Sequence, residues 1–503
     1  TGTYADTVPA GREGVVNKDI HGKLRWAFAT HQNLEFSAGY SRQGNLYAGD
    51  TQNTNTSALV QSKYGDETNR LYRQDYALTW TGVWDNGMST RSYAQYENTR
   101  NSRINEGLAG GTEGIFSDSG FSTIELNDVL LHSEVSIPFE FLINQTTTVG
   151  TEWNQQRMKD GASNTQALSG GAINGISSSN RSPYSSAEIF SLFAEDNMEL
   201  TDTTTLVPGL RFDHHSIVGN NWSPSLNLSQ ILADDFTLKL GIARTYKAPS
   251  LYQTNPNYVL YSRGQGCAAS AGACYLMGNE DLKAETSINK EVGVEYKHDG
   301  YQAGLTWFRN DYRDKIESGY APTGATGRTD IYKWENVPKA VVEGLEGTVN
   351  LPVTETLSWN NNLTYMLQSK NKTTGDRLSV IPQYTLNSTL SWQATQELSL
   401  QTTFTWYGRQ TPKKYNYKGE AVSGTEKSTV SPYSLLGFSG TYDVNKYASV
   451  TVGIDNLFDK RHFREGNAQT TGNSTTGAYM YGAGANTFNE SGRTYYMSLN
   501  THF

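Results

Sequence analysis

The chain has 503 residues, of which 36% are hydrophobic, and its mean hydropathy is -0.58. No run approaches the roughly 18 apolar residues of a membrane-spanning helix, which excludes a helical membrane protein. The net charge of -9 argues against a nucleic-acid partner, because phosphate binding requires a basic face. Residues 1–20 lack the charged and apolar regions of a signal peptide, so we expect a mature or trimmed chain.

Alternating apolar and polar residues recur in segments of strand length along the whole chain. We count about nineteen such segments, each long enough to cross a bilayer as a tilted strand. The clearest are residues 23–29, 236–243, 292–296, 303–307, 398–406 and 495–503. Lys239 and Glu295 fall in mid-strand, where a charge suits a wall that faces a watery lumen. The pattern predicts an all-β fold, a transmembrane antiparallel β-barrel.

The connections between these segments alternate between short and long. Tight turns are expected at residues 85–87, 298–300 and 395–397. The long polar connections lie near residues 43–70, 100–123, 158–186, 248–285, 318–340, 369–385, 411–433 and 461–492. The exception is the short connection at residues 219–221, where a long one is expected. Short turns at one end and long loops at the other are typical of bacterial outer-membrane barrels.

The strand count suggests that part of the barrel precedes this chain. If the chain ends in the periplasm, counting backwards makes residues 23–29 run from the outside inward. Single-chain bacterial barrels have an even number of strands and both ends in the periplasm, so an odd number should come first. We therefore expect residues 1–503 to be the C-terminal part of a barrel of about 22 strands.

Three stretches make the chain resemble the TonB-dependent outer-membrane receptors. They are "RTYKAPSLYQTNPNY" (residues 244–258), "NEDLKAETS" (279–287) and "GIDNLFDKR" (453–461). The long segments at residues 40–55 and 62–74 narrow the resemblance to receptors for catecholate siderophores. The resemblance implies a 22-stranded barrel that imports an iron(III)-siderophore complex, ferric enterobactin, with energy from the TonB-ExbB-ExbD system. It also implies an N-terminal plug domain and first strands that are not in this sequence.

Arginine and aromatic residues gather at the expected outer ends of two neighbouring strands. Such a set suits a ferric tris-catecholate, which presents about three negative charges and three flat rings. From composition alone, membrane anchors or lipopolysaccharide contacts are the favoured interpretation. The resemblance instead implies siderophore capture by Tyr47, Tyr64, Arg70, Tyr72, Arg73, Tyr76, Arg103 and Phe116, with Arg100 nearby. Leu59 stands where the resemblance implies an aromatic residue, which alters the expected aromatic arrangement.

Cys267 and Cys274 are the two cysteines of the chain, and both lie in one long loop. In an oxidising compartment such neighbours are expected to form a disulfide. A metal site is disfavoured because no further cysteine or histidine lies near. We expect neither a resident metal nor a cofactor, since the iron complex is cargo.

Two rival functions remain open beside the receptor. "RFDHHS" places Asp213, His214 and His215 near the outer end of a strand, as in a surface hydrolase, but adjacent histidines point to opposite faces. No motif of a serine hydrolase, zinc protease or P-loop enzyme appears in a suitable context, so no catalytic residue is assigned. A passive channel is the second rival, although about 22 strands imply a plugged lumen.

The resemblance also sets the expected location and partners. We expect the outer membrane of a Gram-negative bacterium, with extracellular loops and a periplasmic C-terminus. Lipopolysaccharide and outer-membrane lipid should surround the barrel. Colicins or phages that use the surface loops are further expected partners.

Overall fold

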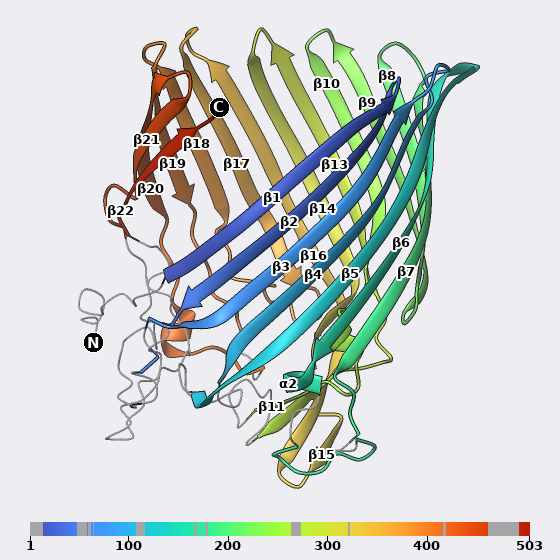
Figure 1. The fold of residues 1–503 in the computed structure, drawn as a ribbon, viewed down its shortest axis with the longest axis vertical. Helices are drawn as coiled ribbons and strands as arrows, with labels where there is room; N and C mark the ends of the chain where they lie inside the picture. The colour runs from blue at the N-terminus through green and yellow to red at the C-terminus, as the bar shows by residue number, and fades with distance from the viewer. Residues whose placement is uncertain are drawn as a thin grey trace.

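The computed structural model describes residues 14–47, 58, 62–63, 65–106, 116–164, 168–176, 180–262, 273–319, 322–415, 419–460 and 492–503. Within these residues, nineteen long strands form one curved antiparallel sheet, and three short strands form a second, small sheet with part of β16 (Figure 1). Within the described residues, no helix is long and apolar enough to cross a bilayer. The predicted fold class is confirmed.

The strands of the large sheet follow the alternating segments of the sequence. They are β1 (Gly14–Ala29), β2 (Gln32–Leu46), β3 (Glu67–Val83), β4 (Ser89–Glu106), β5 (Phe116–Phe141), β6 (Ile143–Asp160), β7 (Tyr184–Glu199), β8 (Thr204–His215), β9 (Gly219–Ala233), β10 (Phe236–Lys247), β13 (Glu285–His298), β14 (Tyr301–Ser318), β16 (Thr329–Pro352), β17 (Leu357–Asn371), β18 (Tyr384–Gln393), β19 (Leu398–Tyr407), β20 (Tyr433–Asn445), β21 (Ala448–Asp455) and β22 (Thr494–Thr501). Each pairs with its neighbour in chain order, with β10 on β13 and β14 on β16 where the small strands intervene. No pairing joins β1 to β22 in the described part of the chain, so these two strands are the edges of the sheet.

The two faces of the sheet differ in chemistry, as the alternation predicted. Phe236 and Ile242 are exposed on the face that we call outer, where apolar side chains meet lipid. On the opposite, inner face the Glu295 carboxylate pairs with the ammonium groups of Lys239 at 3.0 Å and Lys297 at 2.6 Å. The charged mid-strand residues therefore lie on the polar wall, as expected.

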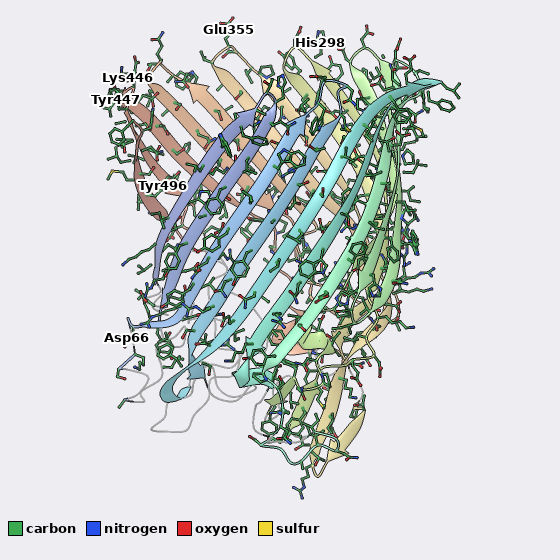
Figure 2. All side chains as sticks on the ribbon, turned by 45° about the vertical axis from the view of Figure 1, so that its right-hand side comes forward. Asp66, His298, Glu355, Lys446, Tyr447 and Tyr496 are labelled. Carbon is green, nitrogen blue, oxygen red and sulfur yellow. The ribbon has the colours of Figure 1, made fainter. Side chains whose placement is uncertain are left out.

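Short turns gather at one end of the sheet and long connections at the other. His298, Glu355 and Lys446 mark the short-turn end, and Asp66 lies at the opposite end (Figure 2). The turn between β13 and β14 consists of Asp299 and Gly300, which adopt φ of 48° and 85°. Positive φ at both positions gives the backbone twist that a two-residue hairpin requires. We call the other end the loop end.

The ends of three predicted segments differ from the structure. The first strand begins at Gly14, earlier than the predicted start at residue 23. The last ends at Thr501 and not at Phe503. The short connection predicted at residues 219–221 consists of residues 216–218, since β9 already begins at Gly219. Gly219 has φ of 81°, so the glycine that indicated a turn allows the sharp return into β9.

Three long connections at the loop end pack into one body, which local sequence patterns do not predict. Its elements are α2 (Gly161–Asn164), α3 (Leu251–Thr254), β11 (Val259–Ser262), β12 (Cys274–Met277) and β15 (Gly324–Thr326), while the 3-10 helix η1 (Gly424–Lys427) lies in a separate connection. Val259 and Tyr275 are completely buried in its core with Ile173. The Tyr275 hydroxyl accepts from the Gly170 amide at 2.7 Å and donates to the Gly171 carbonyl at 2.9 Å. These hydrogen bonds join segments that are about a hundred residues apart in sequence within the loop-end body.

Candidate functional site

Strands β3 and β4 carry most of the predicted ligand-binding residues and lie side by side at the loop end. Their register sets Asn69 opposite Arg103 and Tyr72 opposite Arg100. Because successive side chains of a strand point to opposite faces, odd and even positions separate. Leu78 is exposed on the outer face, so the even positions of β3 are outer and the odd positions are inner.

Arg73 and Arg103 therefore lie on the inner face. The Arg73 Nε is 3.1 Å from a Glu97 carboxylate oxygen, and both side chains are about half exposed. Arg103 is exposed, and no carboxylate of the described residues lies within ion-pair distance of it. A free guanidinium at the mouth of the lumen is available to an anionic ligand.

Arg70, Tyr72 and Tyr76 lie on the outer face, so the structure does not bring all the predicted residues together. Tyr72 lies between Arg42 and Arg100, whose guanidinium carbons are 6.0 and 5.1 Å from its ring centroid. Their closeness in sequence predicts one cluster. Alternation separates them into an inner pair and an outer set.

Glu67 neutralises much of the charge of this outer set. Its carboxylate forms an ion pair with Arg42, and the Arg70 Nε is 3.2 Å from one of its oxygens. Arg70 also lies over the Phe121 ring, 5.7 Å from its centroid. Further toward the short turns, Tyr76 and Tyr96 stack with centroids 6.4 Å apart. The row of tyrosines is typical of the aromatic girdle of a barrel in lipid.

The loop between β10 and β11 brings two aromatic residues toward the inner pair, Arg73 and Arg103. These aromatic residues are not among the predicted site residues. The Tyr252 hydroxyl donates to Asp160 at 2.7 Å, and its ring is 5.1 Å from that of Tyr258. Burial is the largest cause that raises the pKa of Tyr252, and the hydrogen bond to Asp160 is the next. The positive charge of Arg103 lowers this pKa by a smaller amount. The Tyr252 hydroxyl therefore stays protonated and can donate a hydrogen bond. The sequence signal for these groups is the aromatic-rich stretch at residues 244–258, which also carries the family resemblance.

A serine-capped turn holds these aromatic groups in place. Ser250 caps α3 by accepting from the Gln253 amide, and the Gln253 side chain accepts from the Ser250 amide in return. Leu251 packs with Met158 and Ala187, which lie on the inner face of β6 and β7. The loop is therefore anchored against the inside of the wall.

The remaining predicted residues are only partly described. The Tyr47 amide donates to the Asp66 carbonyl at 2.8 Å, which places it at the loop end. The backbone of Phe116 pairs with Glu106, but its side chain lies outside the described part. Tyr64, Leu59 and Cys267 also fall outside the described residues. Cys274 is disulfide-bonded, and its pairing with Cys267 stays a prediction.

The histidines considered for a hydrolase contribute to a turn. His215 is buried, and its Nδ1 accepts from the Ile217 and Val218 amides at 3.1 and 3.2 Å. His214 Nδ1 is 2.6 Å from the Asn220 side-chain oxygen, on the other face of β8. The Ser191 hydroxyl donates to Asp213, which also pairs with Arg211. Within the described residues, no three metal-ligating side chains come together.

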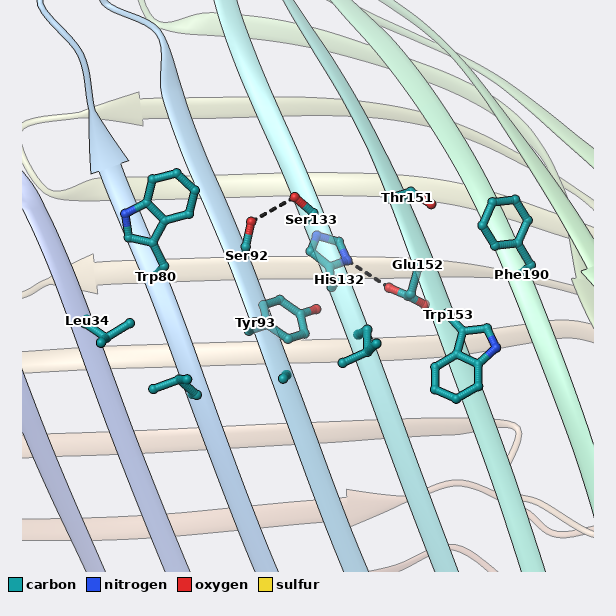
Figure 3. A pocket seen from close by; sticks show the side chains of 13 residues that line it. Leu34, Trp80, Ser92, Tyr93, His132, Ser133, Thr151, Glu152, Trp153 and Phe190 are labelled. Carbon is teal, nitrogen blue, oxygen red and sulfur yellow. Dashed lines mark hydrogen bonds and ion pairs between the residues drawn. The ribbon is translucent and has the colours of Figure 1, made fainter.

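A shallow hollow across β2 to β7 contains none of the predicted site residues (Figure 3). The Ser92 and Ser133 hydroxyls are 2.8 Å apart there, and small side chains leave space between Trp80 and Phe190. On the other side of the same strands, His132 Nδ1 is 2.9 Å from Glu152 and its ring stacks on Tyr93. The hollow belongs to the wall of the barrel.

Residues 10–457 match the family described as "TonB dependent receptor-like, beta-barrel". The chain is 70% identical to the ferrienterobactin receptor of Escherichia coli over its whole length, covering 68% of that protein. It is 60% identical to the ferric enterobactin receptor of Pseudomonas aeruginosa, again covering 68% of it. A crystal structure of a mutant of that receptor in complex with enterobactin has a TM-score of 0.90 at 59% identity, over all of this chain and 72% of that one. The siderophore receptor PirA of Acinetobacter baumannii has a TM-score of 0.86 at 39% identity, with the same coverage.

Proposed function

Because the chain belongs to the TonB-dependent receptor family, we propose that it binds ferric enterobactin at the loop end and imports it with energy from the TonB system. The observation that carries the proposal is the high identity to two enterobactin receptors along the whole chain. The guanidinium groups of the inner-face arginines, Arg73 and Arg103, carry the positive charge that an anionic catecholate complex requires. The iron(III) complex is cargo, and no resident cofactor is proposed.

We assign the first contacts with the ligand to Arg73 and Arg103. Each could stabilise an anionic catecholate by about 1–4 kcal/mol at ~4 Å, depending on the local dielectric. Tyr252 and Tyr258 add flat rings and a hydroxyl donor beside the pair. Tyr47, Tyr64 and Phe116 remain proposed contacts from the loops. Tyr47 and the backbone of Phe116 lie at the loop end, which suits a ligand that is captured before it enters the lumen.

Arg70, Tyr72 and Tyr76 have a different role in this proposal. They lie on the outer face, away from the lumen that a ligand enters, and Arg70 forms an ion pair with Glu67 there. We therefore assign them to the rim that contacts the membrane surface. This assignment divides the predicted ligand-binding residues into an inner-face group and an outer-face group. Variants of each group can be tested separately.

The protein is placed in the outer membrane by its fold and family. We propose that the loop end is extracellular and that the C-terminus, at the short-turn end, is periplasmic (Figure 1). ExbB and ExbD are proposed to act with TonB, and the exposed loops are proposed as a surface for colicins or phages. No chemistry on the ligand is proposed.

Uptake of radiolabelled ferric enterobactin tests the function. The full receptor should be expressed in cells that lack their own, and uptake measured with and without an inner-membrane uncoupler. We expect saturable uptake that the uncoupler abolishes. Uptake that is linear in concentration and insensitive to the uncoupler would indicate a passive channel. Peptide turnover that is lost in His214→Ala or in His215→Ala would favour a hydrolase.

A further inference from the structure

The outer face of β14 changes character abruptly toward the loop end. Its outward side chains run from Leu305 and Trp307 to Arg309, Asp311 and Arg313. Leu305 is 57% exposed, as a lipid-facing residue should be. The tryptophan stands where the apolar positions end, as aromatic residues do at the boundary of the hydrocarbon. On β14, the charged side chains therefore begin directly on the loop-end side of the lipid-facing apolar positions.

The same boundary runs across four neighbouring strands. Going from β13 to β17, the outward row at the boundary is Val292, Trp307, Leu345 and Tyr365. The next row is Lys290, Arg309, Glu343 and Gln368. The row above it is Ile288, Asp311, Val341 and Lys370. The last is Thr286, Arg313 and Lys339, with Lys372 joined to Lys339 by a backbone hydrogen bond of 3.0 Å.

A β-bulge places the lysines of β17 on this face. The register shifts between Glu343 and Gly344, so that Leu367 is an extra residue with no partner on β16. An extra residue reverses the side to which all later side chains point. Without it, Lys370 and Lys372 would face the lumen. Two contacts confirm the reversal, because Gln368 donates to Glu343 at 2.7 Å and Lys372 donates to Asp311 at 2.9 Å.

Cations outnumber carboxylates on these rows. Asp311 is shared by Lys290 at 3.7 Å, Lys372 at 2.9 Å and Arg309 at 3.1 Å. Glu343 accepts hydrogen bonds from neutral donors, the Trp307 indole and the Gln368 amide. In these described rows, the remaining cations are exposed and have no carboxylate within 4 Å; they are Arg313, Lys339 and Lys370. Six cations thus surround two carboxylates.

We propose that the outer face of β13 to β17 binds a membrane lipid that carries phosphate groups, in the leaflet at the loop end. Guanidinium and ammonium groups recognise phosphate oxygens, and the rows stand where the headgroups of that leaflet lie. The apolar side chains directly below provide a wall for the acyl chains. A free anion would use the cations but not this wall, so a lipid fits the surface better. The inference rests on the proposed orientation of the barrel.

The outer set on β2 to β4 provides an internal comparison. Arg42 and Arg70 lie at the same border, but both are paired with Glu67. Arg100 contacts the Tyr72 ring, and its opposite residue on β5 is Glu125. Charge there is nearly balanced. The comparison predicts that lipid phosphate prefers the face of β13 to β17.

Native mass spectrometry of the full receptor in detergent tests this inference. The probe is a diphosphorylated glucosamine glycolipid, compared with the same lipid without phosphates and with inorganic phosphate. The test variant replaces Arg313, Lys339 and Lys370 with Gln, because these residues form no ion pairs in the described structure. The matched control replaces Arg42 and Arg100 with Gln.

We expect the test variant to bind the phosphorylated lipid at least ten-fold more weakly, and the control to stay within about two-fold of the native receptor. Native binding should fall when the phosphates are removed, and inorganic phosphate should not compete at equal concentration. Unchanged lipid affinity in the test variant would overturn the site. Equal loss in both variants would show that any rim cation suffices, and competition by inorganic phosphate would indicate a free-anion site. Ferric enterobactin affinity is measured in parallel, so that failure of this inference is distinguishable from failure of the proposed function.

Discussion

Arg70 and Arg73 lie on the same strand, three residues apart, and project to opposite faces of the sheet. Arg73 pairs with Glu97 on the inner face, while Arg70 pairs with Glu67 on the outer face. A ligand that enters the lumen passes only one of them. This relationship separates the proposed capture residues from the proposed rim residues.

Replacing Arg73 and Arg103 together with Gln should weaken ferric enterobactin binding by ten-fold or more. The loss of about 1.4 kcal/mol already gives that factor. Arg103 is exposed on the inner face, and Arg73 is half exposed there beside Glu97. Affinity is measured by fluorescence quenching of the purified full receptor. The loss should shrink in high salt, because exposed charges are screened.

The matched control for the inner pair is Arg70→Gln combined with Arg42→Gln. These residues belong to the outer face, so their removal should change the affinity for ferric enterobactin by less than about two-fold. If the outer variant loses as much affinity as the inner one, our separation by face is wrong. If neither variant changes, the arginines serve only as anchors.

The separation of Arg70 from Arg73 could have been predicted from sequence, because alternation alone sets their faces. Proximity along the chain alone predicts one cluster, but residues three positions apart on a strand point to opposite faces. The β-bulge at Leu367 is different, since no local pattern marks an extra residue in a strand. The loop-end body was also beyond local patterns, because the parallel pairing of β12 with β16 joins segments far apart in sequence. Contacts between segments distant in sequence determine both the β-bulge and the loop-end body.

Tyr275→Phe should loosen the loop-end body without affecting the barrel. The change leaves the Gly170 amide and the Gly171 carbonyl without their hydroxyl partner, at a net cost of about 0.5–1.5 kcal/mol for each part-buried hydrogen bond. Limited proteolysis should cut the connection between β6 and β7 faster in the variant. The heat-modifiable migration of the barrel on gels should stay native.

The control for this experiment is Tyr301→Phe, at the exposed tip of the β13–β14 hairpin. Tyr301 is 45% exposed, and its hydroxyl has no hydrogen bond in the described structure. Its removal should leave proteolysis unchanged. Equal cleavage rates in native protein and the Tyr275 variant would contradict the role of this hydroxyl.

Leu240→Arg should destabilise the barrel, while Thr237→Arg should be tolerated. Leu240 lies on the outer face of β10, where an arginine near the bilayer midplane costs about 2–4 kcal/mol. Thr237 lies on the inner face opposite Glu295, where a new charge stays in the watery lumen. Urea unfolding in lipid vesicles measures both. Similar midpoints for the two variants would show that we have assigned the faces of β10 wrongly.

The last prediction concerns the end of the chain. Phe503 is fully exposed and follows the end of β22 at Thr501, so its removal costs no packing within the described structure. His502 is anchored through its amide, which donates to the Tyr447 carbonyl at 2.9 Å, and its side chain is exposed too. An aromatic residue directly after the alternating apolar positions of β22 resembles the segment that the barrel-assembly machinery reads. Phe503→Asp should therefore reduce membrane insertion of the full receptor several-fold more than His502→Asp, as measured by heat modifiability of outer-membrane fractions. Since neither side chain supports the fold, a selective defect at Phe503 would come from assembly and not from stability, whereas equal and near-normal insertion of both variants would refute the idea.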